Sequence, residues 1–355
     1  MADTLHVTDP VDQQCHGVLR TEFGRGTFEA RLATAATAGG PPAPGTTWFD
    51  TQTGFAVRRW CAPLLDLDPH CLPAGYLARR RELGVVETGR RLLRATGADA
   101  REIVRLESLA EQIADTSGTV GSFLANLAEA VHTAAASATA FTSDAAAHHG
   151  PEPDPGPPGP GQVRGAAGRW LAGRDAARRA ARTGAGGPRT PGAAPDDPVL
   201  LRHLLWAAVA CGRPLQLQLR STDPRRLAGF AAATAGLGSD LVLLNSYPYH
   251  RHAAQLAHAH PHVYADAGAA PARTGARAAA VLAEILELAP FGKVLFSSGA
   301  QGLPELHVVG AHQFREALGR VLGGWVADGA WSHTDATRGA AMIASGNARR
   351  VYGLG

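Results

Sequence analysis

Cysteine and histidine side chains that are able to do chemistry gather at two places in the chain. Cys15 and His16 are neighbours near its start, and five histidines lie close together further on: His250, His252, His258, His260 and His262. A Cys15–His16 pair of nucleophile and base is disfavoured, because adjacent residues on a strand point to opposite faces. His258 and His262 have the spacing of a metal-binding pair on a helix, but Pro261 interrupts the helix and no carboxylate accompanies them. Neither place alone predicts a catalytic or metal centre.

Small residues stand where a barrel enzyme would place its catalytic groups. The apolar run Val294–Phe296 is broken at once by Ser297-Ser298-Gly299-Ala300, and a helical pattern follows from Glu305 to Asp328. A buried strand that opens into a loop and then a helix is the repeating unit of a (β/α)8 barrel, whose catalytic groups lie just past the strand ends. Ser298 and Gly299 occupy that position, and neither is a metal ligand.

Strand and helix patterns alternate regularly from residue 196 onward. Each predicted strand is followed by a helix, and the strands are Leu215–Leu219, Leu241–Leu244, Val263–Asp266 and Val294–Phe296. This order predicts a parallel sheet wrapped by helices in one domain spanning residues 1–355. Before residue 196 we expect a weak strand at Leu5–Val11 and another at Ile103–Glu107. An Arg-rich helix, residues 164–182, separates Pro/Gly-rich inserts at 145–161 and 183–197, which are expected to be flexible and without regular structure.

Composition narrows the class of protein. The formal net charge of +3 over 355 residues is too small to indicate a nucleic-acid surface, and no 18-residue apolar run or secretory signal predicts a membrane protein. The four cysteines are scattered and form no CxxC pair, so neither a structural zinc site nor a disulfide framework is expected. The abundance of Gly and Pro is typical of a bacterial protein from a GC-rich genome. We therefore expect a cytoplasmic protein.

Several segments resemble the amidohydrolase superfamily. They are QQCHGVLR, GFAVRRWCAPLL, LLRHLLWAAVACGRPLQLQ, LVLLNSYPYHRHAAQLAHAHPHVYADAG, KVLFSSGAQGLPELHVVGAHQFREAL and SGNARRVYGL. The resemblance is to the amidohydrolase-2 branch, related to the amidohydrolase half of certain glutamine-synthetase fusion proteins, and it covers the first 95 residues and nearly all of 196–354. It implies a distorted TIM-like (β/α)8 barrel that holds zinc or another divalent metal. The metal activates a water that hydrolyses an amide or ester bond, or supports decarboxylation in some members.

The metal ligands of the family are mostly replaced in this chain. The resemblance places them at Gln14, His16, Gln218, Asn245 and Gly299, where the family has four histidines and an aspartate, so only His16 is kept. Amide oxygens are poor donors to a transition metal, and glycine offers no side chain. We therefore expect no bound metal and a degenerate site.

Other residues are candidates to line a pocket, and each has a structural alternative. Glu107 is either a pocket acid or a solvated loop carboxylate. Tyr247, Tyr249, His250 and Arg251 keep the family's YPYHR turn and are expected to line the pocket mouth, where they could bind a substrate carboxylate; the alternative for Arg251 is that it simply starts a helix. Asp266 ends a strand, where it orients a ligand or makes a structural hydrogen bond. The arginines of residues 164–182 are expected to form a solvated face, and the alternative is a surface for an acidic partner or nucleic acid.

The middle of the chain departs from the family pattern. The chain passes almost directly from Gly97 to Ile103, and the Pro-rich stretch Gly150–Gly159 stands where a fourth strand is expected, so strands 2 and 4 are predicted to be irregular or missing. Uncovered sheet edges favour a homo-oligomer or a partner protein. Two functions remain open. One is a non-catalytic binding or scaffolding subunit with a small-molecule ligand in the barrel mouth. The other is a hydrolase or lyase with an altered or metal-free site.

Overall fold

The chain divides into two compact units in the computed structural model. The structure describes residues 5, 7–21, 24–36, 47–48, 51–97, 99–148, 154–182, 194–220, 222–268 and 273–355. Unit 1 comprises Met1–Ala100, Asn245–His258 and Tyr264–Gly355, and unit 2 comprises Arg101–Leu244 and Ala259–Val263. The prediction of one domain with two flexible inserts stays a prediction, and residues 149–153 and 183–193 of the inserts lie outside the described residues.

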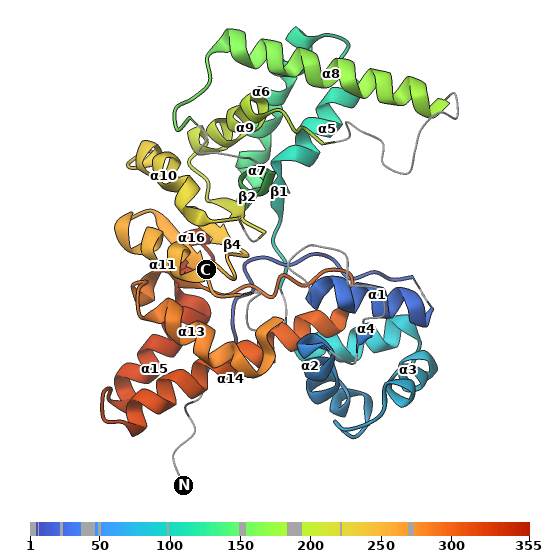
Figure 1. Ribbon diagram of the computed structural model, residues 1–355, viewed down its shortest axis with the longest axis vertical. Coiled ribbons are helices and arrows are strands. Elements are labelled where there is room, and N and C mark those ends of the chain that lie inside the picture. Colours follow the sequence, from blue (N-terminus) through green and yellow to red (C-terminus); the bar gives the residue numbers. More distant parts are fainter. Residues whose placement is uncertain are drawn as a thin grey trace. The chain divides into compact units, whose positions relative to one another are not determined.

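Unit 2 contains four parallel strands that pair in sequence order. They are β1 (Ile103–Arg105), β2 (Ala140–Ser143), β3 (Leu215–Gln218) and β4 (Leu241–Leu244) (Figure 1). In register, Val104 is opposite Phe141, Phe141 is opposite Leu215, and Leu215 is opposite Leu241. All residues of β3 and β4 are buried, as expected for parallel strands that are covered on both faces.

Helices surround these strands within unit 2. They are α5 (Leu106–Thr116), α6 (Val120–Ser137), α7 (Ala145–His148), α8 (Pro160–Arg182), α9 (Pro198–Ala210) and α10 (Ala228–Thr234), with a 3-10 turn at Pro224–Leu227. Thr119 and Ser122 form a reciprocal capping box at the start of α6, and Asp197 caps α9 just before Pro198. Helix α8 packs against α6 and α9.

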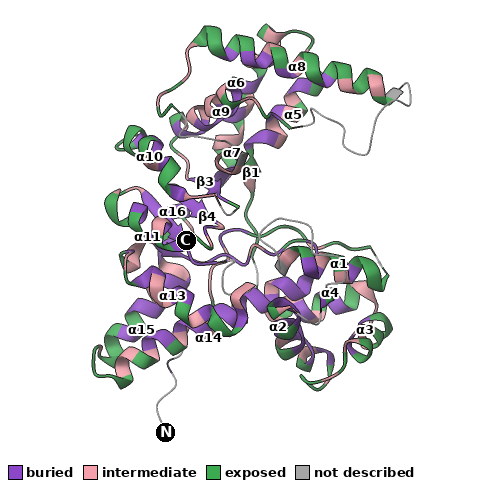
Figure 2. Ribbon diagram, viewed as in Figure 1, coloured by how far each residue is buried: buried purple, intermediate pink, exposed green. Residues whose placement is uncertain are grey.

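Unit 1 has two short parallel strands and a helical majority. β5 (Val263–Asp266) pairs with β6 (Val294–Leu295). The helices are α1 (Arg25–Ala36), α2 (Gln52–Cys61), α3 (Pro73–Glu82), α4 (Gly84–Arg94), α11 (His250–Ala259), α13 (Ala278–Leu286), α14 (Pro304–Ala327), α15 (His333–Ala341) and α16 (Asn347–Tyr352), with a π-helical turn at Met342–Gly346 and 3-10 turns at Pro63–Leu65, Gly275–Arg277 and Phe291–Lys293. Helix α14 packs against α2, α4, α13 and α15 and is buried along much of its length (Figure 2).

The start of the chain lies beside the segment after β6. Gln13 N–H donates to the Phe296 carbonyl (3.1 Å), Gly299 N–H to the Gln14 carbonyl (3.1 Å) and His16 N–H to the Ala300 carbonyl (2.8 Å). A single parallel bridge joins Val18 to Gly302. The expected strand at Leu5–Val11 is wrong for the described residues there, which form no strand. Long-range backbone bonds nevertheless tie residues 13–19 to residues 296–302.

Three further expectations are corrected. A strand does precede the Arg-rich helix, since β2 pairs with both β1 and β3 and lies just before the Pro-rich stretch. The insert from 145 is not devoid of regular structure, because Ala145–His148 is helical. The strand expected at Ile103–Glu107 ends at Arg105, and Glu107 lies in the first turn of α5. The α/β class itself is confirmed, because the described residues form six parallel strands that follow one another in sequence order.

Candidate functional site

Asp12 is fixed by the turn that follows β6. Its Oδ1 accepts the N–H of Ser298 (2.9 Å) and of Gln14 (3.3 Å), and its Oδ2 accepts Ser298 Oγ–H (2.5 Å). Burial raises the pKa of Asp12 to about 6, and the hydrogen bonds from Ser298 offset only part of that rise. A serine of the small turn therefore holds a carboxyl from the other end of the chain.

Asp266, at the end of β5, accepts a hydrogen bond from Ser297, just as Asp12 accepts one from Ser298. Ser297 Oγ–H donates to one carboxyl oxygen (2.9 Å), and Gln13 Nε2 (3.1 Å) and the Gly268 N–H (3.0 Å) donate to the other. Tyr352 donates its hydroxyl hydrogen to Gln13 Oε1. Burial, with a smaller contribution from the nearby Asp12, raises the pKa of Asp266 to about 7. Asp266 was expected either to orient a ligand or to make a structural hydrogen bond. The structure contains hydrogen bonds of the second kind.

Cys15 and His307 lie close to Asp12. One potential ligand atom from each of the three residues lies within 4.8 Å of the others, and His307 comes from the first turns of α14. Burial of the Cys15 thiol, together with the Asp12 carboxyl, raises the pKa of Cys15 to about 12, so the thiol is protonated at neutral pH. Burial lowers the pKa of His307, which favours the neutral imidazole. This group combines an oxygen, a sulfur and a nitrogen donor.

Gln14 and His16 are brought together, but not as a metal-binding pair. The Gln14 Nε2 amide lies 3.1 Å from His16 Nε2, so the glutamine side chain contacts the ring of the one family ligand that the resemblance predicts to be kept. Gln14 is buried, and its Oε1 has no hydrogen-bond partner among the described residues.

The remaining family positions also lack donors of the required kind. Asn245 has a positive φ of 56° and accepts a hydrogen bond from Arg273 (3.5 Å). Gly299 has a φ of 59° and supplies only its backbone N–H. Gln218 is buried at the end of β3 in unit 2. Two amides and a glycine do not fit a site built for imidazoles and a carboxylate.

The tyrosines and histidine of the YPYHR turn form a group of their own. His250 is buried, and its Nε2 lies 2.9 Å from Glu284 Oε2 on α13. Tyr247 stacks on His250 with ring centroids 5.6 Å apart, and Tyr249 stacks on His252 at 5.9 Å. These contacts anchor the start of α11 to α13, and whether the group lines a pocket stays a prediction.

Glu107 is buried rather than solvated. Its carboxylate accepts Ser143 Oγ–H (2.5 Å), the Asp144 N–H (3.0 Å) and Arg105 Nε–H (3.3 Å). Arg105 and Arg220 both bond to Asp144. The strand ends of unit 2 thus carry a charge-balanced network of two arginines and two carboxylates.

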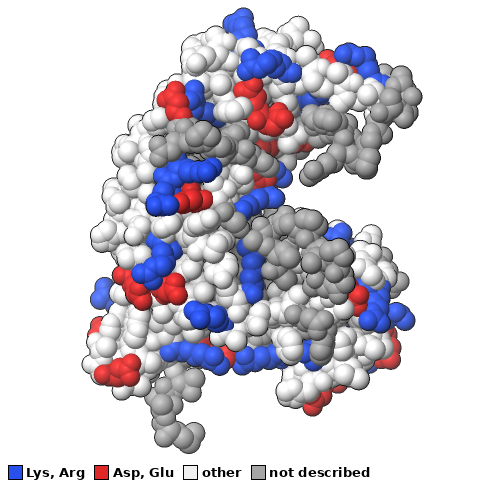
Figure 3. Space-filling model, in the orientation of Figure 1, with Lys and Arg blue, Asp and Glu red and all other residues white. Residues whose placement is uncertain are grey.

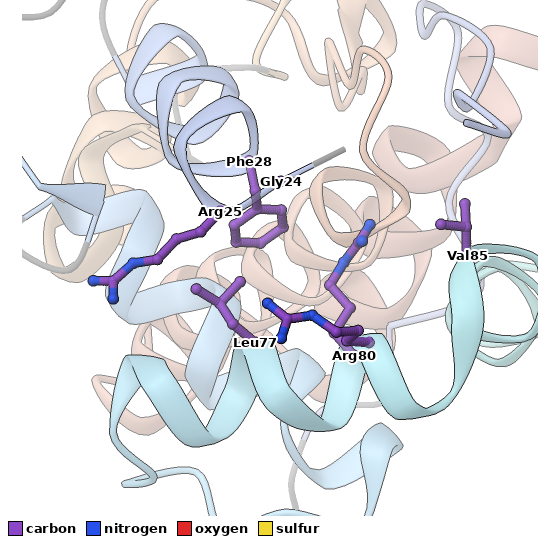
Figure 4. A pocket seen from close by; sticks show the side chains of 7 residues that line it. Gly24, Arg25, Phe28, Leu77, Arg80 and Val85 are labelled. Carbon is purple, nitrogen blue, oxygen red and sulfur yellow. The ribbon is translucent and has the colours of Figure 1, made fainter. Parts of the chain in front are cut away.

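A cavity of ≈ 240 Å³ lies elsewhere in unit 1, between α1 and the α3–α4 region (Figure 4). Phe28 and Leu77 face each other across it, while Arg25 extends away from the ring. Its lining consists of Gly24, Arg25, Phe28, Leu77, Arg80, Arg81 and Val85. No residue that was predicted as a site residue is among them.

Sequence reasoning missed Asp12 and His307. Asp12 stands two residues before Gln14, and a carboxylate so near a ligand position was an available signal. His307 stands eight residues after Gly299 on a helix that was predicted correctly, but no spacing in the sequence shows that residues 12 and 307 meet.

An α/β fold with polar side chains past the ends of parallel strands is the arrangement in which enzymes of the (β/α)8 barrel class place their sites. The chain belongs to the amidohydrolase family, because the family model described as Amidohydrolase matches residues 98–354. Protein fluG from Emericella nidulans is 37% identical over 117 residues, which is 32% of this chain and only 14% of that protein.

Two solved structures have similar folds. A protein of Lactobacillus casei, classed there as a metal-dependent hydrolase, superposes with a TM-score of 0.76 at 19% identity, over 99% of this chain and 96% of that one. Uronate isomerase of Thermotoga maritima gives a TM-score of 0.51 at 16% identity, over 76% of this chain and 65% of that one. At these identities the likeness concerns the fold alone. In the part of the chain that the structure describes, no helix is long and apolar enough to cross a bilayer.

Proposed function

We propose that this amidohydrolase-family protein is a cytoplasmic binding or scaffolding subunit that does not run the family's metal-dependent hydrolysis. The observation that carries the proposal is Gly299. It stands where the family has its aspartate, and its N–H is bonded to the Gln14 carbonyl at 3.1 Å. Without that carboxylate, the position has no base to take a proton from a metal-bound water.

Gln14, whose carbonyl accepts the Gly299 N–H, supports the same proposal. Hydrolysis by this family requires a Lewis-acidic metal with an open coordination position for water. Gln14 instead directs an amide nitrogen at His16, the one family ligand that is kept. We propose that such a protein binds a small molecule in the mouth of the barrel. We also propose that a second copy or a partner protein covers the sheet edges.

The experiment measures hydrolysis with metal supplied. The purified chain is incubated with zinc, manganese or iron(II) and a panel of N-acyl amino acids, dipeptides, lactones and aryl esters. No turnover above the metal-only background is expected. A parallel thermal-shift screen of small carboxylic acids and amines seeks the ligand. Metal-dependent turnover that a chelator abolishes would overturn the proposal.

A restored variant sharpens this comparison. Gln14→His, Asn245→His and Gly299→Asp return three family donors within unit 1, and circular dichroism reports whether the variant folds. Turnover by the folded variant alone would identify the lost donors as the cause. Turnover by the wild-type chain that His16→Gln removes would contradict the proposal.

The alternative function, a hydrolase or lyase with an altered site, is favoured by one observation. Asp12, Cys15 and His307 are grouped beside the former ligand positions, although none of them occupies one. Turnover that persists in His16→Gln but is lost in Cys15→Ser would support this alternative.

A further inference from the structure

Asp12, Cys15 and His307 converge from two distant segments of unit 1. Their potential ligand atoms all lie within 4.8 Å of one another. In a tetrahedral zinc site, bonds of about 2.0–2.3 Å place ligand atoms about 3.3–3.8 Å apart. The three side chains therefore need to close by no more than about 1.5 Å to share one ion.

From this geometry we propose that Asp12, Cys15 and His307 bind a thiophilic divalent cation such as zinc. A carboxylate, a thiolate and an imidazole are all donors that zinc accepts in proteins, and three protein donors leave one position open. The sulfur donor selects against magnesium and calcium, which prefer oxygen ligands.

Within the residues that the structure describes, an unpaired ring nitrogen of His307 independently indicates a missing ligand at this group. His307 is hydrogen-bonded to the backbone of His16, while its Nε2 is buried without a partner among the described residues. Metal-binding histidines commonly have one ring nitrogen bonded to the backbone and the other on the metal. Gln14 is 7% exposed, and its Oε1 is likewise buried and unpaired in the described part of the chain. A cation at the group would supply the partner that His307 Nε2 lacks among the described residues.

The surroundings of Asp12 hold it in place. Ser298 donates both its N–H and its hydroxyl to the carboxylate, and such outer contacts orient metal ligands. Helix α14 lies directly against this serine, because a Cβ added at Gly310 would come within 2.6 Å of Ser298 Cβ. The serine thus links the loop that carries two donors to the helix that carries the third.

This site goes beyond the proposed function, because binding a cation requires no turnover. It also differs from the family's site, because none of its three donors occupies a position that the resemblance assigns to a family ligand, although Gln14 and His16 lie beside it.

The test titrates metal-free protein with cobalt(II) and then with zinc. One cobalt per chain with a thiolate-to-cobalt charge-transfer band is expected, and zinc should displace it. Cys15→Ser should abolish the band. Loss of an outer-shell partner typically weakens metal binding about 10–100-fold. Cys15→Ser, His307→Gln and Asp12→Asn each remove a direct ligand and should weaken binding by at least that factor. The matched controls Cys71→Ser and His312→Gln should bind as the wild type does.

Chemical protection tests the same site without a substitution. Zinc should slow alkylation of Cys15, which is exposed as a residue, but not that of Cys71 or Cys211. Equal alkylation of Cys15 with and without zinc would overturn the inference. So would cobalt binding without a sulfur band, or binding that His16→Gln abolishes and Cys15→Ser leaves intact. Zinc-dependent hydrolysis that Cys15→Ser removes would overturn the proposed function and leave this inference standing.

Discussion

Ser297 and Ser298 each bond to a different buried carboxyl group. Ser297 donates to Asp266, and Ser298 donates to Asp12. Two acids held by adjacent residues repel each other when both are ionised, and burial penalises each charge separately. The Ser297–Ser298 turn thus holds two carboxyl groups whose pKa values are both raised, to about 6 for Asp12 and to about 7 for Asp266.

Asp266 should make stability depend on pH. Its pKa is raised from 3.8 to about 7 in the folded chain, so the folded state keeps a proton that the unfolded state releases. The stabilisation is complete below pH 4 and is lost as the pH rises through 7. Between pH 5 and 7.5 the wild type should lose about 2–3 kcal/mol of unfolding free energy that Asp266→Asn does not lose.

Urea denaturation of both proteins at a series of pH values measures this difference. Glu129→Gln, which removes an acid from the exposed face of α6, serves as the control and should follow the wild type. Parallel pH profiles for Asp266→Asn and the wild type would contradict the prediction.

Single positions were predictable to different degrees. Asp266 was identified because it ends a clear apolar run, and its partners Gln13 and Ser297 were not, because they are joined to it only by the fold. Glu107 was assigned to a strand end since Ile103–Leu106 looks extended, but Leu106 already begins α5. Hydrogen bonds between distant segments leave no spacing to read in the sequence.

Helix α14 connects the candidate site to the α1–α4 region. Its first turn carries Glu305, which pairs with Arg80 of α3 at 2.6 Å and accepts a bond from Tyr76 at 3.4 Å. Further along the same helix, Gly310 packs against Ser298. The helix was predicted from its long apolar pattern, and its contacts give it a positioning role that the pattern alone did not indicate.

Replacing Gly310 by alanine should therefore disturb the site. The added Cβ would lie 2.6 Å from Ser298 Cβ and 3.0 Å from its Cα, which forces the helix and the turn apart. A loss of about 1–3 kcal/mol is expected from such overpacking. Gly323→Ala on the same helix meets nothing within 4 Å and should instead stabilise by about 0.5–1 kcal/mol. Chemical denaturation of the two variants decides, and equal effects would show that Ser298 and α14 are not in tight contact.

The Arg80–Glu305 pair should behave as a buried ion pair. The side chains are 9% and 0% exposed, and Glu305 Oε2 has no hydrogen-bond partner among the described residues. Arg80→Met leaves a buried carboxylate without its cation and should cost about 3–5 kcal/mol. The double variant Arg80→Met/Glu305→Leu should recover much of that loss. Denaturation of the single and double variants measures the coupling, and additive losses would contradict it.

Elements with long or uniform apolar patterns were predicted well. β3, β4 and β5 appear within one residue of their predicted bounds, because runs such as Leu241–Leu244 are apolar throughout. β2 was missed because AFTS is short and follows an alanine-rich helix. The expected first strand is replaced by the irregular pairing of residues 13–19 with 296–302, which depends on partners nearly 300 residues away.

Charges across the protein are largely balanced. The chain has 34 Lys and Arg against 31 Asp and Glu, and Figure 3 shows both signs interspersed over the face in view. The Arg-rich helix α8 follows the same rule. Arg174 and Arg178 both pair with Asp115, and Arg169 pairs with Asp197. Arg174 is also buried over the Trp170 ring, so part of the stripe contributes to packing rather than forming a solvated face.

Binding to nucleic acid should consequently be absent near physiological salt. Non-specific affinity for duplex DNA depends on the number of phosphates that cations neutralise, and arginines already paired with carboxylates contribute little to that number. Fluorescence anisotropy with a short labelled duplex should show no saturable binding at about 0.15 M salt. At low salt, Asp115→Asn/Asp197→Asn should bind more tightly than the wild type, because it releases three arginines on α8. The control Glu129→Gln/Asp328→Asn changes the net charge equally without releasing them and should bind less tightly than the α8 variant. Strong binding by the wild type with a steep salt dependence would mean that the arginines of α8 are available to phosphates after all.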